Sequence, residues 1–256
     1  MKLSVLSSGS KGNSTLIDNG DTKILIDLGV TKLYVEEKLN ELEEDPKNIN
    51  AILITHTHVD HIQGLKVFLK KYHPIVYVTE ELLSLLREYD LDAQYKLYEN
   101  NKAIIGNITI TLIKTSHDAK GSVGFVINDN NSSCVYITDT GYINSKYFSL
   151  LKNHNLYIME SNHDVKMLMN GGYPYHLKKR ILGDKGHLSN DDAAYYLSEF
   201  IGNKTKTVIL AHLSDENNNP DIALQTVKEV LDKKDKKLKT LIVAKQKQRT
   251  DWIEVW

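Results

Sequence analysis

Short apolar, often β-branched runs separated by glycine-containing turns dominate the first part of the chain. Such runs predict strands, because a buried strand needs about four to eight residues of this kind between turn signals. Between two of them, Leu33, Val35, Leu39 and Leu42 recur at helical spacing, which predicts a helix over Thr31–Glu44. The strands predicted in this part are Leu3–Leu6, Ser14–Asp18, Lys23–Asp27 and Ala51–Thr55.

Strands and helices continue to alternate along the rest of the chain. Ser189 and Asp192 resemble the paired residues of a capping box, so a helix is expected over Ser189–Phe200. Other helices are predicted over Ile62–Lys71 and Pro220–Leu231. The further strands expected are Ile75–Val78, Ile108–Thr115, Ser122–Asn128, Ser133–Thr138, Leu156–Met159, Thr207–Leu210 and Thr240–Ala244. Because no repeat or linker divides the sequence, we expect one α/β domain over residues 1–256: a four-layer αββα sandwich of two mixed β-sheets flanked by helices.

Composition and charge narrow the function only slightly. The chain has 256 residues, of which 41% are hydrophobic and 25% charged, and its net charge is −1. It therefore has no strong overall attraction to nucleic acid, and any basic binding surface must be local. A single cysteine, Cys134, excludes an internal disulfide and is typical of a buried thiol in a reducing cytoplasm. No apolar run has transmembrane length, so we expect a cytoplasmic protein that does not enter the membrane.

Candidate metal ligands follow the predicted strands. His56, His58, Asp60 and His61 come directly after the apolar run over residues 51–54, and they supply three imidazoles and a carboxylate. Three more ligand-type residues each lie one step beyond another hydrophobic run: His117, Asp139 and His212. Since neighbouring strands bring their following loops to one edge of a sheet, these side chains are expected to converge on metal.

The order and context of these residues resemble the metallo-β-lactamase superfamily of dinuclear hydrolases. The resemblance implies two divalent metal ions, zinc or manganese with iron as a further candidate, and a supporting role for Asp27 at the end of a strand. It implies that one ion is held by His56, His58 and His117, the other by Asp60, His61 and His212, and that Asp139 lies between them. Asp60 also counts among the expected catalytic residues. The nucleophile expected in such a site is a hydroxide that bridges the ions.

Three further motifs are similar to the YycJ/WalJ-like subgroup of this superfamily, namely Ser7–Ser14, Glu160–Asp164 and Gly186–Ala194. That similarity implies a 5′-to-3′ DNA exonuclease of the mismatch-repair type. His187 is expected to contact phosphate, and His163 to act as a general acid or a phosphate clamp. The candidate substrate contacts are Ser10, Asn13, Asn162, Ser189 and Asn190, although helix capping alone is the commoner use of a residue such as Ser189.

Two basic segments bear on a DNA substrate. Tyr173–Arg180 combines aromatic and cationic residues, which suits unpaired bases and phosphates. Lys228–Arg249 has nine Lys/Arg against three Asp/Glu, but such a run is more often a solvated helix face. Two other functions stay open: a hydrolase of small esters, thioesters or lactones, and a non-catalytic, metal-stabilised nucleic-acid-binding module. The sequence leaves the native metal, DNA against RNA, cleavage polarity and oligomeric state undetermined.

Overall fold

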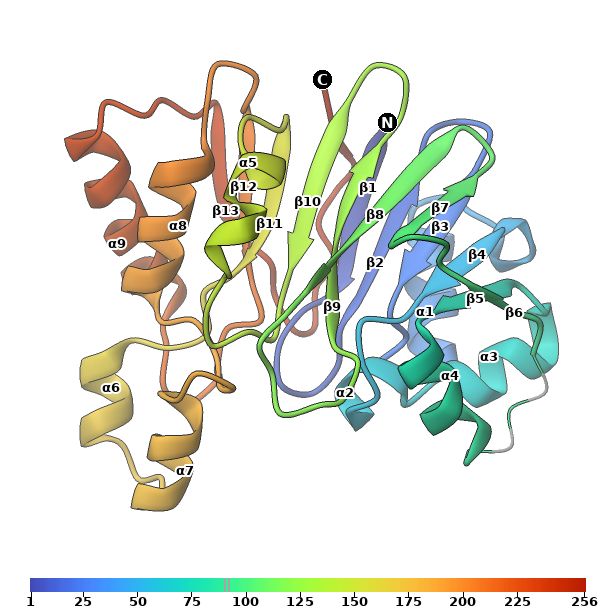
Figure 1. The fold of residues 1–256 in the computed structure, drawn as a ribbon, viewed down its shortest axis with the longest axis horizontal. Coiled ribbons are helices and arrows are strands. Elements are labelled where there is room, and N and C mark those ends of the chain that lie inside the picture. Colours follow the sequence, from blue (N-terminus) through green and yellow to red (C-terminus); the bar gives the residue numbers. More distant parts are fainter. Residues whose placement is uncertain (90, 92) are drawn as a thin grey trace.

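Two seven-stranded mixed sheets face each other in the computed structural model, which describes residues 1–89, 91 and 93–256 (Figure 1). In spatial order, the first sheet consists of β14 (Ile253–Glu254), β1 (Lys2–Ser7), β2 (Ser14–Asp18), β3 (Lys23–Ile26), β4 (Ala51–Leu53), β5 (Ile75–Val78) and β6 (Tyr95–Leu97). The second consists of β13 (Thr240–Val243), β12 (Thr207–Ala211), β11 (Leu156–Glu160), β10 (Ser133–Ile137), β9 (Val123–Asn128), β8 (Ile108–Lys114) and β7 (Lys102–Ile105).

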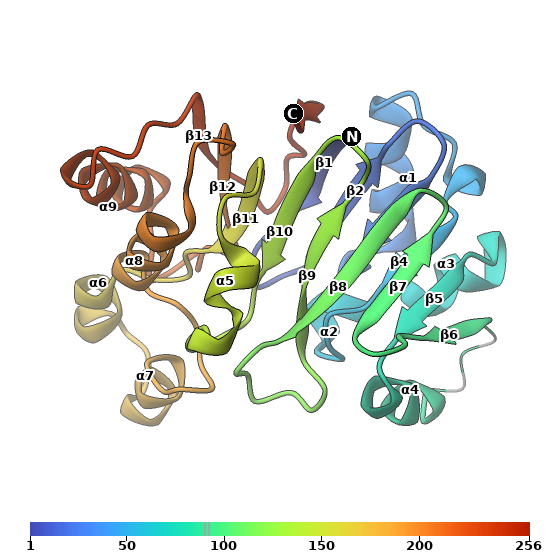
Figure 2. The same cartoon turned by 45° about the horizontal axis from the view of Figure 1, so that its top comes forward.

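Helices cover the outer face of each sheet, so the predicted four-layer αββα class is confirmed (Figure 2). The first sheet is covered by α1 (Lys32–Glu41), α3 (Leu65–Tyr72) and α4 (Glu80–Arg87). The second is covered by α5 (Phe148–Leu151), α8 (Asn190–Phe200) and α9 (Pro220–Lys233). Three more helices lie near one edge of the sheets, α2 (Val59–Ile62), α6 (Val165–Asn170) and α7 (Tyr175–Ile181), and 3-10 turns occur at Pro46–Asn48 and Ser145–Tyr147.

Three apolar clusters fill the three spaces between the layers. Strand β3 contributes residues to two of these clusters: Ile24 and Ile26 pack between the sheets, whereas Leu25 packs under α1 and α3. This follows from the two-residue period of a strand that is buried on both faces. Cys134 lies in the cluster between the sheets as a free thiol, and burial raises its pKa to about 12. It is therefore an apolar packing residue rather than a nucleophile.

Several element boundaries differ from the prediction. Helix α1 ends at Glu41 instead of residue 44, and Leu33 is 71% exposed, although its spacing suggested burial. The helix expected over residues 62–71 is interrupted at Gly64, which separates α2 from α3. Ser189 precedes α8 as its N-cap, with the reciprocal Asp192 contact that defines a capping box. Elements for which no range was predicted are α4, α5, α6, α7, β6, β7 and β14, and only the last residue of α2 lies in a predicted helix.

Strand directions bring the predicted ligands to one edge. In the first sheet β3, β4 and β5 are parallel, and in the second β10, β11 and β12 are parallel. Strand β8 is antiparallel to β9, which is antiparallel to β10, so β8 ends at the same edge as β10. The loops that follow these strands therefore meet on one side of the sandwich, as the sequence predicted for a shared site.

Candidate metal centre

Three residues of the site leave their strands in a left-handed backbone conformation. Asp27, Asp139 and His212 follow β3, β10 and β12 and have φ values of 58°, 56° and 57°. For residues other than glycine this conformation costs roughly 1–3 kcal/mol and is concentrated at functional sites. The repeated turn ends each strand abruptly at the shared edge.

One group of ring nitrogens comes from two loops. His58 Nδ1 lies 3.1 Å from His56 Nε2 and 3.3 Å from His117 Nε2. His56 and His117 are buried, whereas His58 is half-buried at the cavity. Three imidazole nitrogens at this separation form a ligand set suited to a divalent cation.

A second group lies beside the first. Asp60 Oδ2 is 3.5 Å from both His61 Nε2 and His212 Nε2. Asp139 lies between the groups, with Oδ2 3.2 Å from His61 Nε2 and Oδ1 3.8 Å from His117 Nε2. All seven sequence-predicted ligands are thus brought together, and the position of Asp139 agrees with a carboxylate shared by both groups.

Unpaired buried atoms indicate that these residues fit divalent cations. Asp139 Oδ2 and His212 Nε2 are buried and, among the described residues, have no hydrogen-bond partner. Burial would lower the pKa of His212, but Asp139, Asp60 and Glu160 raise it to about 10. The negative charge of these carboxylates therefore stabilises a positive charge at His212. A divalent cation would be stabilised by the same carboxylates and would take the place of the ring protons.

Two buried carboxylates contact the Nδ1 atoms of imidazoles at the site. Asp27 accepts from His61 Nδ1 at 2.7 Å and from the backbone N–H and hydroxyl of Thr55 at 2.8 and 2.7 Å. Glu160 Oε1 accepts from His187 Nδ1 at 2.7 Å and lies 3.1 Å from His212 Nδ1. Such contacts fix the orientation of a ring and strengthen its other nitrogen as a ligand or donor. Asp27 was expected in this role, whereas Glu160 was not identified from the sequence, although it begins one of the quoted motifs.

The two histidines predicted to act on substrate have different surroundings. His187 lines the cavity beside the ligand groups. His163 is only 1% exposed, does not line that cavity, and neither ring nitrogen has a hydrogen-bond partner among the described residues. Burial lowers its pKa to about 4, so the ring is neutral near pH 7. This placement does not support the catalytic role expected of His163.

The predicted substrate contacts also separate into two kinds. Ser10 and Asn162 line the cavity, and Asn162 Nδ2 donates to the His212 carbonyl at 2.9 Å. Asn13 lies behind the site, where Nδ2 is 3.2 Å from His61 Nε2. Ser189 is used in the capping box of α8, and Asn190 is fully buried with its amide bonded to Ser161 and Asn218. Ser189 and Asn190 are therefore placed as structural residues, and neither lines the cavity.

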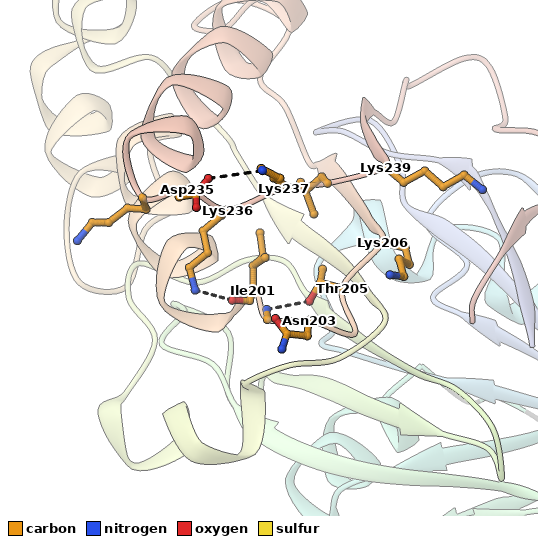
Figure 3. A pocket seen from close by; sticks show the side chains of 11 residues that line it. Ile201, Asn203, Thr205, Lys206, Asp235, Lys236, Lys237 and Lys239 are labelled. Atoms are coloured by element: carbon orange, nitrogen blue, oxygen red, sulfur yellow. Dashed lines mark hydrogen bonds and ion pairs between the residues drawn. The ribbon is translucent and has the colours of Figure 1, made fainter.

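The cavity at the ligand groups has a volume of about 250 Å³. A larger one, about 670 Å³, lies at the other end of β12, and its lining residues include Lys206, Lys236 and Lys239 (Figure 3). The five residues of β12 separate Lys206 from His212, and six steps along a strand span roughly 20 Å. No histidine lines the larger cavity and Asp235 is its one carboxylate among the described residues, so we assign the chemistry to the smaller one.

Comparisons with known proteins agree with this geometry. The model of the beta-lactamase superfamily domain matches residues 22–213. Exodeoxyribonuclease YycJ of Bacillus anthracis is 36% identical over 91% of this chain and 90% of its own length, and exodeoxyribonuclease WalJ of Streptococcus pneumoniae is 37% identical over 88% and 86%. The crystal structure of the metallo-beta-lactamase fold protein YhfI from Bacillus subtilis superposes with a TM-score of 0.74 at 18% identity, covering 97% of this chain and 98% of that one. The chain therefore belongs to the beta-lactamase superfamily, with YycJ and WalJ among its relatives.

Proposed function

We propose that this protein is a metal-dependent 5′-to-3′ DNA exonuclease. The observation that carries the proposal is the cluster of histidines and aspartates at a cavity, in a chain that is 36–37% identical over most of its length to relatives named exodeoxyribonucleases. A phosphodiester needs positive charge and proton donors around its oxygens during cleavage, and this cavity presents both kinds of group.

Two divalent ions, zinc or manganese with iron as an alternative, are part of the proposal. His56, His58 and His117 would hold one, Asp60, His61 and His212 the other, and Asp139 would touch both. When bound, such ions acidify water and stabilise negative charge on phosphate oxygens. Glu160 and Asp27 would keep the rings oriented toward them.

The remaining steps are assigned to side chains at the cavity. Burial would raise the pKa of Asp60, but the contacts with His212 and His61 hold it below its ordinary value, so the carboxylate stays ionised and can orient the attacking water as a hydrogen-bond acceptor. His187 is fixed through Nδ1 by Glu160, and among the described residues Nε2 has no hydrogen-bond partner. We assign to His187 the transfer of a proton to the leaving oxygen.

The test is a nuclease assay with manganese or zinc on 5′-phosphorylated DNA, labelled in turn at each end. Release of mononucleotides from the 5′ end is expected, with a loss of at least about 100-fold in Asp60→Asn and His61→Ala, each checked by circular dichroism to be folded. Asp235→Asn, at an exposed carboxylate by the remote cavity, is the matched control. Faster turnover of thioesters or lactones than of DNA, or full activity in both ligand variants, contradicts the proposal.

We propose that residues 1–256 form one domain, because β14 near the C-terminus pairs with β1 near the N-terminus. No helix in the described part of the chain is both long and apolar enough to cross a membrane. The cytoplasmic location and the role in mismatch repair follow from the resemblance to YycJ/WalJ-like proteins, and a raised mutation rate after gene deletion is the expected sign of that role.

A further inference from the structure

One wall of the metal-site cavity is formed by a projecting segment, residues 165–185, which we call the arm. It contains α6 and α7 and extends away from both sheets (Figures 1 and 2). Among its described helical residues only Leu168 is buried. The arm therefore contributes little to the hydrophobic core, and its residues at the cavity point to a role in binding.

The side of the arm that lines the cavity is aromatic and aliphatic. Tyr173, Leu177 and Ile181 line it at intervals of four residues, so they share one side of α7 and the turn before it. All three are half-buried. They line the same cavity as His58, His187 and other residues of the metal site. An apolar surface in the same cavity as a phosphate-reactive centre suits the flat face of a nucleobase.

Two cations of the arm, Arg180 and Lys185, line the same cavity. Arg180 Nε donates to Asp118 Oδ2 at 2.6 Å, and Asp118 Oδ1 is 3.5 Å from His58 Nε2. This is the one hydrogen bond found for the Arg180 side chain among the described residues, so both terminal nitrogens can serve a ligand. Lys178 differs, because its Nζ is occupied by the carbonyl oxygens of Met169 and Gly171.

We propose that the arm forms a subsite for one unpaired nucleotide next to the phosphate that is cleaved. Tyr173 stacks on the base, Leu177 and Ile181 support it, and Arg180 binds the 5′-phosphate of that nucleotide, a group that a small phosphodiester lacks. A cavity of about 250 Å³ is small for a base pair, so we expect the last pair of a duplex to open before cleavage. The inference rests on the proposed DNA exonuclease activity and names the form of DNA end that it accepts.

Matched pairs of variants test the subsite. Tyr173→Ala is compared with Tyr175→Ala, whose side chain belongs to the same arm but is 75% exposed and does not line the cavity, and Arg180→Gln is compared with Lys179→Gln. The readout is kcat/KM for an oligonucleotide with an unpaired end divided by kcat/KM for bis(p-nitrophenyl) phosphate. We expect this ratio to fall about tenfold or more in Tyr173→Ala and Arg180→Gln, to be largely restored in Tyr173→Phe, and to stay within twofold in both controls.

The outcomes separate this inference from the proposed function. DNA degradation by the unsubstituted protein with equal ratios in each pair overturns the subsite alone. No DNA degradation by the unsubstituted protein overturns both. Should Tyr173→Ala fail to fold, Tyr173→Leu keeps apolar packing without the ring, and its ratio is expected to fall as well. A blunt end closed by G·C pairs should be cut several-fold more slowly than an unpaired end, and equal rates contradict the requirement for an open pair.

Discussion

The carboxylate of Glu160 lies 2.7 Å from Nδ1 of His187 and is fully buried. Its other oxygen accepts the backbone N–H groups of Thr140 and Leu188 at 3.0 and 3.1 Å. Burial would raise the pKa of Glu160, but His187 and His212 lower it to about 2, so the group is an anion at neutral pH. One fixed negative charge thus orients a ring at the cavity wall and, through His212, a ring of the metal site.

Glu160→Gln should therefore impair turnover more than binding. The amide keeps the size of the side chain but removes the charge that fixes His187 and His212. We expect kcat on DNA to fall by roughly 10–100-fold, with a smaller change in KM. Glu88→Gln, at an exposed carboxylate, is the control and should leave both constants unchanged. Normal kcat in Glu160→Gln, with normal metal content, would exclude this positioning role.

Much of the metal site was predictable because its ligands leave strands at a shared edge. The sequence shows where an apolar run ends, and the chain order of His117, Asp139 and His212 then indicates which loops meet. It does not show which way a side chain points. For this reason His163 was expected at the substrate but is buried. Glu160 was not assigned a role, although it orients the rings of His187 and His212.

Most of the fold was predictable from the two periodicities, whereas the arm was not. Its helices are six and seven residues long, and α7 has no buried residue, so neither shows an apolar stripe of useful length. The N-cap of α8 was predicted correctly because Ser189 and Asp192, which form it, are close together in the sequence. The exposure of Leu33 was not predictable, because its helical spacing with Val35 and Leu39 does not show which side of α1 faces the sheet.

Metal removal should lower the stability of the folded protein. A ligand that binds the native state at about 100 times its Kd contributes roughly 2.7 kcal/mol, which for a chain of this size is a rise in melting temperature of roughly 5–10 °C. We therefore expect Mn²⁺ or Zn²⁺ to raise the melting temperature and EDTA to reverse the effect. His56→Ala combined with His212→Ala should abolish the response. An equal metal-induced rise in this double variant would show that the ions bind elsewhere.

Gly29 permits the loop that carries Asp60 to approach the chain after β3. A Cβ at Gly29 would lie 1.6 Å from the carbonyl oxygen of Asp60, which also accepts from the backbone N–H of Asn13 at 2.8 Å. Gly29→Ala should therefore displace Asp60, lower stability by roughly 1–3 kcal/mol and remove most activity. Gly172→Ala, where a Cβ meets nothing within 4 Å, should keep the wild-type melting temperature. Equal melting temperatures for the two variants would contradict this account of Gly29.

Glu36 links α1 to α3 and makes part of the stability dependent on pH. Its carboxylate accepts from Lys71 at 2.8 Å and also contacts Lys32 and Tyr72. Burial would raise the pKa of Glu36, but these donors outweigh it and lower the pKa to about 2. A lowered folded-state pKa stabilises the protein above the unfolded value of about 4.3, and that contribution is lost as pH falls toward 2.

Glu36→Gln should consequently differ from the unsubstituted protein only where Glu36 is ionised. In urea unfolding at pH 5 to 7, we expect the free energy of unfolding of Glu36→Gln to be about 1 kcal/mol lower than that of the unsubstituted protein. This deficit is small because Lys71 is largely exposed and the contact is screened. At lower pH the carboxyl of Glu36 becomes neutral and resembles the amide, so the deficit should shrink between about pH 4.3 and 2. The comparison at each pH cancels the titration of other groups. A deficit that stays constant from pH 7 to 3 would mean that shape, rather than charge, accounts for the effect of the substitution.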